Sequence, residues 1–427
     1  MLTTAERQPA WAGRPDGGHR APAAPARKSL RVPRWWRDAV GSVTWASVLV
    51  VTVLWIAGGG VQDLGGIASG LTSVGRLTGL VASDLLLIQV LLMARIPMVE
   101  RVYGQDELAR RHRLVGFTSF NLMVAHVLLI TLGYAGASSS NPIATFWDFI
   151  VTYPGMLLAL AGTLLLVLVT VTSIRKARKK LRYESWHLLH LYAYLGVGLA
   201  LPHQLWTGQE FLTSPAATLY WWSLWIVAAG AILTWRVAVP VYRTLVHDLR
   251  VTAVVRESPD VVSVLMSGRN LRRLPVAAGQ FFTWRFLTGP SWTRGHPYSL
   301  SAAPTGDTLR ITVKDLGDGS RALAQLRPGT RVAIEGPYGR LHDGVRSRRK
   351  VTLLASGIGV TPLRALMEQL PQRPGDVTLI YRASSTDDLV FKAEIDALAL
   401  ANGARVFYVL GHRVTDRASW LPRSAGH

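Results

Sequence analysis

Six long apolar runs dominate the first 240 residues of the chain. Each run is about 20 residues long, which is the length that crosses the hydrocarbon core of a bilayer as a helix. The fifth run is the least hydrophobic, but it contains no Lys or Arg. The pattern predicts a six-helix transmembrane bundle within residues 38–246. The runs cover residues 40–59, 75–97, 112–135, 155–174, 184–203 and 218–240.

After residue 246 the chain changes to shorter elements. Six β-type segments occupy residues 247–346, and several alternate polar and apolar positions, which predicts an antiparallel β-barrel. From residue 347 a strand–helix–strand–helix–strand order predicts a parallel sheet with crossover helices. The predicted fold class is therefore a multi-domain membrane protein: a six-helix transmembrane bundle, then an antiparallel β-barrel domain, then a Rossmann-like α/β domain over residues 347–427.

The distribution of positive charge orients the predicted helices. The chain has 47 Lys and Arg against 26 Asp and Glu, a net charge of +21. Residues 14–37, 95–113 and 175–182 hold eighteen of these cations, whereas the three alternate loops, 60–74, 136–154 and 204–217, hold none. This positive-inside pattern predicts a multi-pass protein of the cell membrane with both termini in the cytoplasm. Topology and contact with lipid account for the excess charge, so we expect no nucleic-acid binding.

Residues 1–37 differ from the rest of the chain. They are rich in Ala, Pro, Gly and Arg and lack the apolar run of a signal peptide. We therefore predict a disordered basic N-terminal arm.

Histidines occur at matching depths in two predicted spans. His112 and His126 lie in the third span, and His190 and His203 lie in the fifth. Both spans start at the cytoplasmic side, and the separations of fourteen and thirteen residues correspond to about 21 and about 20 Å along a helix axis. Two pairs of facing imidazoles suit bis-histidine ligation of two haems.

Other interpretations of these histidines stay open. His187 lies one turn before His190 and is a second candidate for the inner ligand. On an ideal helix, His190 and His203 point about 140° apart, so the interpretation requires a local distortion near Pro202. Each histidine can also simply bond a neighbouring helix. Because the chain has no cysteine, cysteine-ligated haem and cysteine-held iron–sulfur clusters are excluded.

A glycine-containing turn follows the first strand of the predicted α/β domain. It reads Gly357-Ile-Gly359-Val-Thr361-Pro362 and precedes a predicted helix. Glycines let the backbone approach a pyrophosphate, and the N-terminus of the helix favours the anion. The turn is therefore a candidate nucleotide-binding loop.

Four motifs in the second half, HPYSLSAAP, KDLGDGS, GPYG and ASGIGVTP, resemble in order and spacing those of the ferredoxin–NADP reductase superfamily. Together with the histidine pairs and the stretch YESWHLLH, they make residues 40–427 similar to a bacterial member of the ferric reductase / NADPH oxidase family. The resemblance implies two b-type haems, FAD and NADPH, and favours His190 over His187. It also implies transmembrane electron transfer from cytoplasmic NADPH through FAD and the haems to an extracellular ferric chelate or dioxygen.

The resemblance assigns residues to two nucleotide sites, without a catalytic residue. Tyr298 is expected against the isoalloxazine ring and Ser299 near its reactive edge. His296 stands where soluble reductases usually carry Arg, which favours the membrane branch. The implied FAD residues are Arg294, His296, Pro297, Tyr298, Ser299, Gly319 and Ser320. The implied NADPH residues are Gly357, Gly359, Thr361, Pro362 and Arg382, the last as a partner of the 2′-phosphate or, alternatively, a solvated surface arginine.

Family members continue to a Cys-Gly-Pro motif, whereas this sequence ends at DRASWLPRSAGH. We therefore expect the domain over residues 347–427 to be incomplete at its C-terminus. Two functions stay open: an NAD(P)H-dependent transmembrane oxidoreductase, and a haem-bearing membrane anchor or electron-transfer subunit that needs a partner for turnover.

Overall fold

The computed structural model describes residues 35–174, 183–208, 214–289, 294–370 and 373–411. Nearly all of the predicted basic arm and the whole of the cationic loop 175–182 lie outside these ranges.

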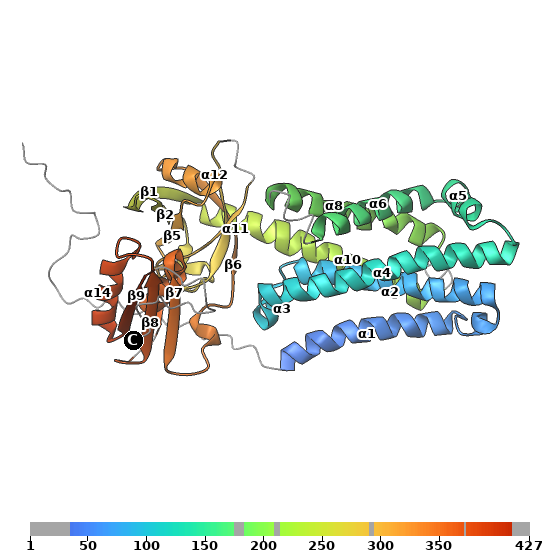
Figure 1. The fold of residues 1–427 in the computed structure, drawn as a ribbon, viewed down its shortest axis with the longest axis horizontal. Coiled ribbons are helices and arrows are strands. Elements are labelled where there is room, and N and C mark those ends of the chain that lie inside the picture. The colour runs from blue at the N-terminus through green and yellow to red at the C-terminus, as the bar shows by residue number, and fades with distance from the viewer. Residues whose placement is uncertain (1–34, 175–182, 209–213, 290–293, 371–372, 412–427) are drawn as a thin grey trace, which may run out of the picture.

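Long helices form a bundle at one end of the molecule, and two β-sheet domains lie at the other end (Figure 1). Within the described residues, five helices are long and apolar enough to cross a membrane: α1, α2, α4, α6 and the continuous segment Pro215–His247. The helix α8 covers the predicted fifth span and packs along α6, but its polar residues, including three histidines, lower its hydropathy. The bundle helices are α1 (Trp35–Ala57), α2 (Ile67–Met93), α4 (Gln105–Ser138), α6 (Met156–Ser173), α8 (Tyr183–Trp206) and α10 (Pro215–Ile232).

The search for long apolar runs did not predict several helical segments around the bundle. Two short helices, α3 (Pro97–Tyr103) and α5 (Pro142–Thr152), lie in predicted loops, and a π-helical turn (Leu233–Ala238) and α11 (Val239–His247) continue α10. The helix α4 starts seven residues before its predicted span. Its first turn is acidic, and Glu107 pairs with Arg110 and Arg111, both at 3.0 Å, which extends a helix beyond its apolar part.

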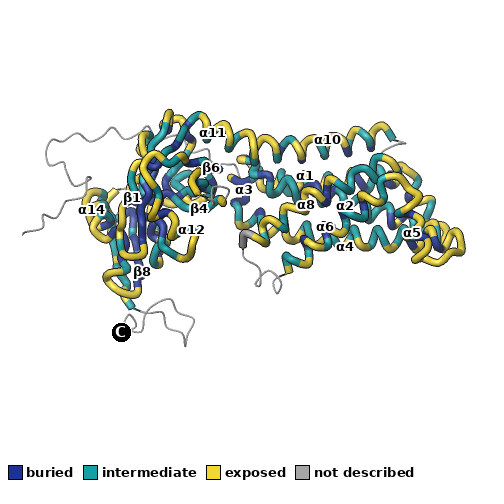
Figure 2. Tube along the Cα trace, turned by 90° about the horizontal axis from the view of Figure 1, so that it is seen from above, coloured by how far each residue is buried: buried dark blue, intermediate teal, exposed yellow. Residues whose placement is uncertain are grey.

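Many residues of the bundle helices are exposed (Figure 2), and a large share of them are hydrophobic. A soluble domain would bury such side chains, whereas lipid covers them in a membrane domain. Large exposed hydrophobic residues include Trp45, Leu49, Leu114, Phe117, Leu128, Leu164, Leu188 and Ile226.

The β domain that follows is a six-stranded antiparallel sheet in the order β4-β3-β6-β1-β2-β5. Every β-type segment predicted between 247 and 346 contains one of its strands. An isolated bridge between Leu300 and Ile311 links the two edges of the sheet. Its core includes the fully buried Trp284, Phe282 and Met266. The strands are β1 (Leu249–Ser258), β2 (Val261–Ser267), β3 (Phe281–Phe286), β4 (His296–Ser299), β5 (Thr308–Lys314) and β6 (Arg331–Tyr338).

The α/β domain has a parallel sheet in the order β7-β8-β9, which confirms the predicted alternation of strands and helices. The helix α13 starts immediately after the glycine-containing turn, and its apolar face packs on the sheet around Tyr381 and Leu379. The elements are β7 (Val351–Ser356), α13 (Val360–Gln369), β8 (Val377–Ala383), α14 (Lys392–Asn402) and β9 (Arg405–Leu410).

Two glycines allow α6 and α8 to approach closely. A Cβ at Gly162 would lie 2.6 Å from the carbonyl oxygen of Gly196, and a Cβ at Gly196 would lie 3.0 Å from the carbonyl oxygen of Gly162. Small residues at such crossings let the helix backbones pack in a membrane. The crossing fixes α8, which carries two of the candidate ligand histidines.

We expect Gly162→Ala to destabilise the bundle, because its Cβ meets backbone that cannot rotate away. Overpacking of this kind costs about 1–3 kcal/mol. The measurement is the thermal unfolding of the detergent-purified chain. Gly198→Ala in α8 is the matched control, since an added Cβ there meets nothing within 4 Å. Equal melting temperatures for the two variants would contradict the close crossing.

Candidate electron-transfer site

The first histidine pair lies toward the β domains, near the start of α4 and of α8. The ring centroids of His112 and His190 are 5.9 Å apart, with 63° between their planes. Metal–imidazole bonds of about 2.0 Å place two ring centres about 6 Å apart across one ion. The sequence-predicted inner pair is therefore brought together at a separation that fits one metal ion.

The second pair lies farther along the same two helices. His126 and His203 are close enough to interact electrostatically. The helix α8 runs through Pro202 as a helix residue, and the Nδ1 of His203 lies 2.6 Å from the carbonyl oxygen of Ala200, one turn back. The His203 ring thus lies back along its own helix.

Each of the four rings has a hydrogen-bond partner at Nδ1. The partners are backbone carbonyl oxygens for three of them: Gln89 at 3.3 Å from His112, Gly75 at 2.7 Å from His126, and Ala200 for His203. A carbonyl oxygen only accepts, so Nδ1 carries the hydrogen and the lone pair lies on Nε2. For His190 the partner is the Ser173 hydroxyl at 3.3 Å.

This arrangement fits haem ligation. Metal-ligating histidines donate their second ring N–H to a carbonyl or similar acceptor, which fixes the tautomer and orientation of the ring. The residues that would hold the two haems are His112 with His190 and His126 with His203.

His187 takes a different position from the other histidines. It interacts electrostatically with Arg236, Arg285 and Glu335, where the bundle meets the β domain. The ring of His190, in contrast, lies beside His112. The geometry therefore favours His190 over His187 in the inner pair.

A charged cluster connects the bundle to the β domain. Glu335 on β6 pairs with Arg236 of the π-helical turn at 2.6 Å and with Arg285 on β3 at 3.6 Å. The hydroxyl of Tyr338 donates to Glu335 at 3.0 Å, and the guanidinium of Arg95 stacks on the Tyr338 ring at 4.0 Å. Burial and the charge of Glu335 raise the pKa of Tyr338, which therefore stays protonated as a donor. The cluster therefore joins the β domain to the bundle.

The predicted FAD residues gather around β4. The rings of His296 and Tyr298 lie on one side of the strand, 5.9 Å apart and nearly parallel. A Cβ at Gly319 would lie 2.7 Å from Cε1 of His296, so the turn at the start of α12 (Asp318–Arg321) approaches β4 closely. Burial raises the pKa of Tyr298 to about 12, which keeps its hydroxyl protonated.

The other predicted FAD residues take varied positions. The Ser320 hydroxyl closes its own turn, accepting from Leu316 N and donating to Gly317 O, both at 2.8 Å. Arg294 and Pro297 are exposed, and Ser299 is half-buried at the end of β4.

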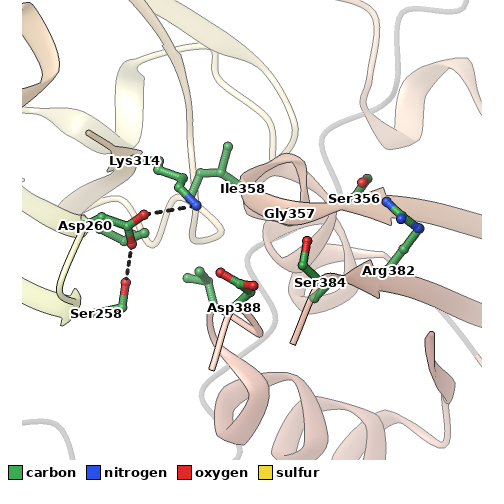
Figure 3. Close-up of a pocket in the computed structure, with 12 residues that line it drawn as sticks. Ser258, Asp260, Lys314, Ser356, Gly357, Ile358, Arg382, Ser384 and Asp388 are labelled. Atoms are coloured by element: carbon green, nitrogen blue, oxygen red, sulfur yellow. Dashed lines mark hydrogen bonds and ion pairs between the residues drawn. The ribbon is translucent and has the colours of Figure 1, made fainter. Parts of the chain in front are cut away.

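A pocket lies at the carboxyl end of the parallel sheet, against the β domain (Figure 3). Of the five residues expected at the NADPH site, Gly357 and Arg382 line this pocket. Gly357 has φ +51°, and a Cβ at Gly357 or Gly359 would meet nothing within 4 Å, so the turn exposes its backbone. Thr361, whose hydroxyl donates to Ile358 O at 3.1 Å, and Pro362 continue from the turn into α13.

The sequence did not predict that residues of the β domain line one side of this pocket. Lys314 and Asp260 line it and form an ion pair at 3.0 Å. Ser384 and Asp388 line it from the loop after β8. Lys314 lies inside the motif KDLGDGS, so that motif contained the signal, but only the fold brings it next to Gly357.

Comparisons with known proteins find two matching regions in the chain. Residues 78–201 match the family model "Ferric reductase like transmembrane component", and residues 353–421 match "Oxidoreductase NAD-binding domain". The chain is 31% identical over 175 residues to a flavohemoprotein of Candida norvegensis, covering 39% of this chain and 45% of that protein. It is 28% identical over 130 residues to NADH-cytochrome b5 reductase 1 of Eremothecium gossypii, covering 29% of this chain and 45% of that protein.

The chain spans less than half the length of these two curated relatives. Among solved structures, it is similar to the flavohem-like FAD/NAD-binding domain of nitric oxide dioxygenase from Vibrio cholerae. That match has a TM-score of 0.34 and 24% identity, and covers 41% of this chain and 78% of that one.

The chain thus joins a region that matches the transmembrane component of ferric reductases to a region that matches an oxidoreductase NAD-binding domain. This is the domain combination that the resemblance to the ferric reductase / NADPH oxidase family implies. The resemblance drawn from the motifs is thereby confirmed.

We expect Gly79→Ala to disturb the second histidine pair selectively. A Cβ at Gly79 would overlap the His126 ring and lie 2.7 Å from its Cε1, which forces the ring away from the Gly75 carbonyl. Haem content and the low-spin absorption spectrum of the purified chain measure the effect, and we expect about half of the haem to be lost. Gly230→Ala in α10 is the control, because its Cβ meets nothing within 4 Å. Full retention of haem in Gly79→Ala would contradict the assignment.

Proposed function

We propose that this chain carries electrons from cytoplasmic NADPH, through FAD and two b-type haems, to an acceptor on the opposite side of the membrane. The observation that carries the proposal is the approach of His112 to His190 in an apolar bundle, with His126 and His203 farther along the same two helices and Nδ1 of each ring engaged in a hydrogen bond. Ferric chelates and dioxygen are both compatible acceptors.

The order of the sites supports this direction of transfer. Both sheets lie at one end of the molecule with β6 facing the bundle (Figure 1), and the nucleotide pocket lies where β7 and β8 meet the β domain. The inner pair, His112 and His190, lies at the end of the bundle nearest the reductase module. A donor on one side and an acceptor on the other are thereby kept apart by the membrane.

The histidines would act as axial ligands in this proposal. Haem iron, when bound by two imidazoles, supplies one-electron oxidation and reduction, with a potential that the ligands and their hydrogen bonds tune. Hydrogen bonds to the Gln89 and Gly75 carbonyls hold the His112 and His126 rings in place.

The β domain and the α/β domain would bind the two nucleotides. FAD, when bound, exchanges the hydride of a nicotinamide for single electrons. The Tyr298 ring and the approach of Gly319 to His296 provide a flat surface and a close backbone on β4. Gly357 and Arg382 provide an open backbone and a cation in the adjoining pocket, and a cation there favours NADPH over NADH through its 2′-phosphate.

The finer architecture is part of the same proposal. We infer six spans rather than five, since α8 packs along α6 and carries His190 and His203. The bridge between Leu300 and Ile311 supports a closed β-barrel. The positive-inside pattern supports cytoplasmic termini.

Replacement of single ligands tests the haem assignment. We expect His126→Leu to lose about one haem of two and to keep the inner one, whereas His112→Leu loses the inner haem. Haem is counted per chain in purified membranes, with the reduced-minus-oxidised spectrum as the second measurement. His187→Gln, at an exposed position, is the control, and this variant should keep both haems. Absence of haem from the unmodified chain, expressed with adequate haem supply, would refute the proposal.

Nucleotide preference tests the reductase module. Arg382→Ala should raise the KM for NADPH by roughly tenfold or more, because one charge-assisted contact to phosphate is lost. The KM for NADH should change little, which makes NADH the internal control. Haem reduction after mixing the purified chain with FAD and either nucleotide is the measurement. If reduction requires an added protein, the chain is instead an electron-transfer subunit.

A further inference from the structure

One carboxyl group lies deep inside the bundle, away from the histidine pairs. Asp84 on α2 is fully buried. Among the described residues it forms no ion pair, and its Oδ2 atom has no hydrogen-bond partner. An ionisable residue within a membrane span is costly and usually has a function.

The partners of Asp84 come from two other helices. Ser47 Oγ of α1 lies 2.6 Å from Asp84 Oδ1, and Tyr220 Oη of α10 lies 2.5 Å from the same oxygen. The Ser47 and Tyr220 hydroxyl oxygens are also only 2.7 Å apart. Three oxygens therefore form a closed triangle in which each edge has the length of a hydrogen bond.

Counting hydrogens determines the protonation state of this triangle. Three hydrogen bonds need three hydrogens, and the hydroxyls of Ser47 and Tyr220 supply one each. If Asp84 were ionised, one edge would bring two oxygens to 2.5–2.7 Å without a hydrogen between them. A carboxyl hydrogen completes a ring in which every oxygen donates once and accepts once. It also makes the unpartnered Oδ2 the oxygen of a neutral acid, which costs less to bury than a carboxylate oxygen.

Charged groups that would favour the ionised form of the Asp84 carboxyl lie away from it. The helix α10 presents Tyr220, and the ionisable residues of α1, Arg37 and Asp38, precede Ser47 by at least nine positions. On α4 the charged residues lie in its first turns, and His112 and His126 contact α2 at other positions. Arg76 of α2 pairs with Asp63.

We propose that Asp84, Ser47 and Tyr220 form a proton-binding site in the interior of the membrane domain, with the proton held on the Asp84 carboxyl. The site lies five residues along α2 from Gly79, which abuts His126, and five from Gln89, which bonds His112. It is thus midway, about 7.5 Å along the axis, between the two histidine levels. If the histidines bind haem as proposed above, an added electron at either level strengthens the binding of this proton.

Infrared spectroscopy of the purified full-length chain tests the protonated carboxyl directly. The unmodified chain should show a carboxylic-acid C=O band that shifts when aspartate is labelled with carbon-13 and is lost in Asp84→Asn. The band should be present in sodium and in potassium buffers at neutral pH. Asp148→Asn, which removes an exposed acid on α5, is the control and should keep the band.

Two results would overturn the proposal. No loss of an acid band in Asp84→Asn would mean that the carboxyl is ionised, and disappearance of the band on adding sodium would mean that the site binds a metal cation. Asn mimics the neutral acid, so Asp84→Asn should melt close to the unmodified chain. If Asp84→Asn does not fold, Tyr220→Phe removes one donor from the triangle and should shift the band, and an unshifted band would count against the proposal.

Redox titration tests the coupling separately. In the haem-loaded chain, the midpoint potential should fall as pH is raised past the point at which Asp84 loses its proton, and this dependence should be absent in Asp84→Asn. Identical pH dependence in both proteins would refute the coupling. A chain that shows the infrared band but binds no haem would refute the proposed electron transfer and leave the proton site standing.

Discussion

The structure of the bundle depends on one requirement: a polar ring placed in hydrocarbon must find its hydrogen-bond partner within the protein. For His126 the partner is the Gly75 carbonyl on α2, and the ring reaches it by passing over Gly79, where a side chain would block it. Gly75 itself approaches the Ile130 backbone of α4. The close contact of α2 and α4 therefore packs the two helices and also orients the candidate ligand His126.

The reductase module is attached through groups that obey the same requirement. Glu335 is buried, and two arginines from different elements and the Tyr338 hydroxyl surround it. Removing one partner of such a group is costly because the remaining charge stays desolvated. Burial likewise raises the pKa of Glu100 on α3, although the charge of Arg95 partly offsets the effect.

Much of this arrangement could be predicted from the sequence because it rests on local periodicity. Helix spacing placed His112 and His126 on one side of α4, and strand–turn–helix order located the loop at Gly357. The partners of Asp84 could not be predicted, since Ser47 and Tyr220 are 37 and 136 positions away and neither belongs to a motif. The same holds for Arg236 and Glu335, which are 99 positions apart. The helices α3 and α5 were missed because a search for apolar runs of bilayer length passes over short ones.

Asp84 and the histidines lie on opposite faces of α2. The width of this helix therefore sets the distance over which a charge at the histidines can act on the Asp84 proton. An α-helix with side chains is about 10 Å across. With the axial offset of about 7.5 Å, a charge at either histidine level is about 12 Å from Asp84, and two unit charges at that separation interact by about 1.4 kcal/mol when the effective dielectric constant is about 20. This energy corresponds to a change of roughly tenfold in a binding constant. A helix that orients the ligands on one face can thus also couple their charge to a proton on the other, without any contact between the two sites.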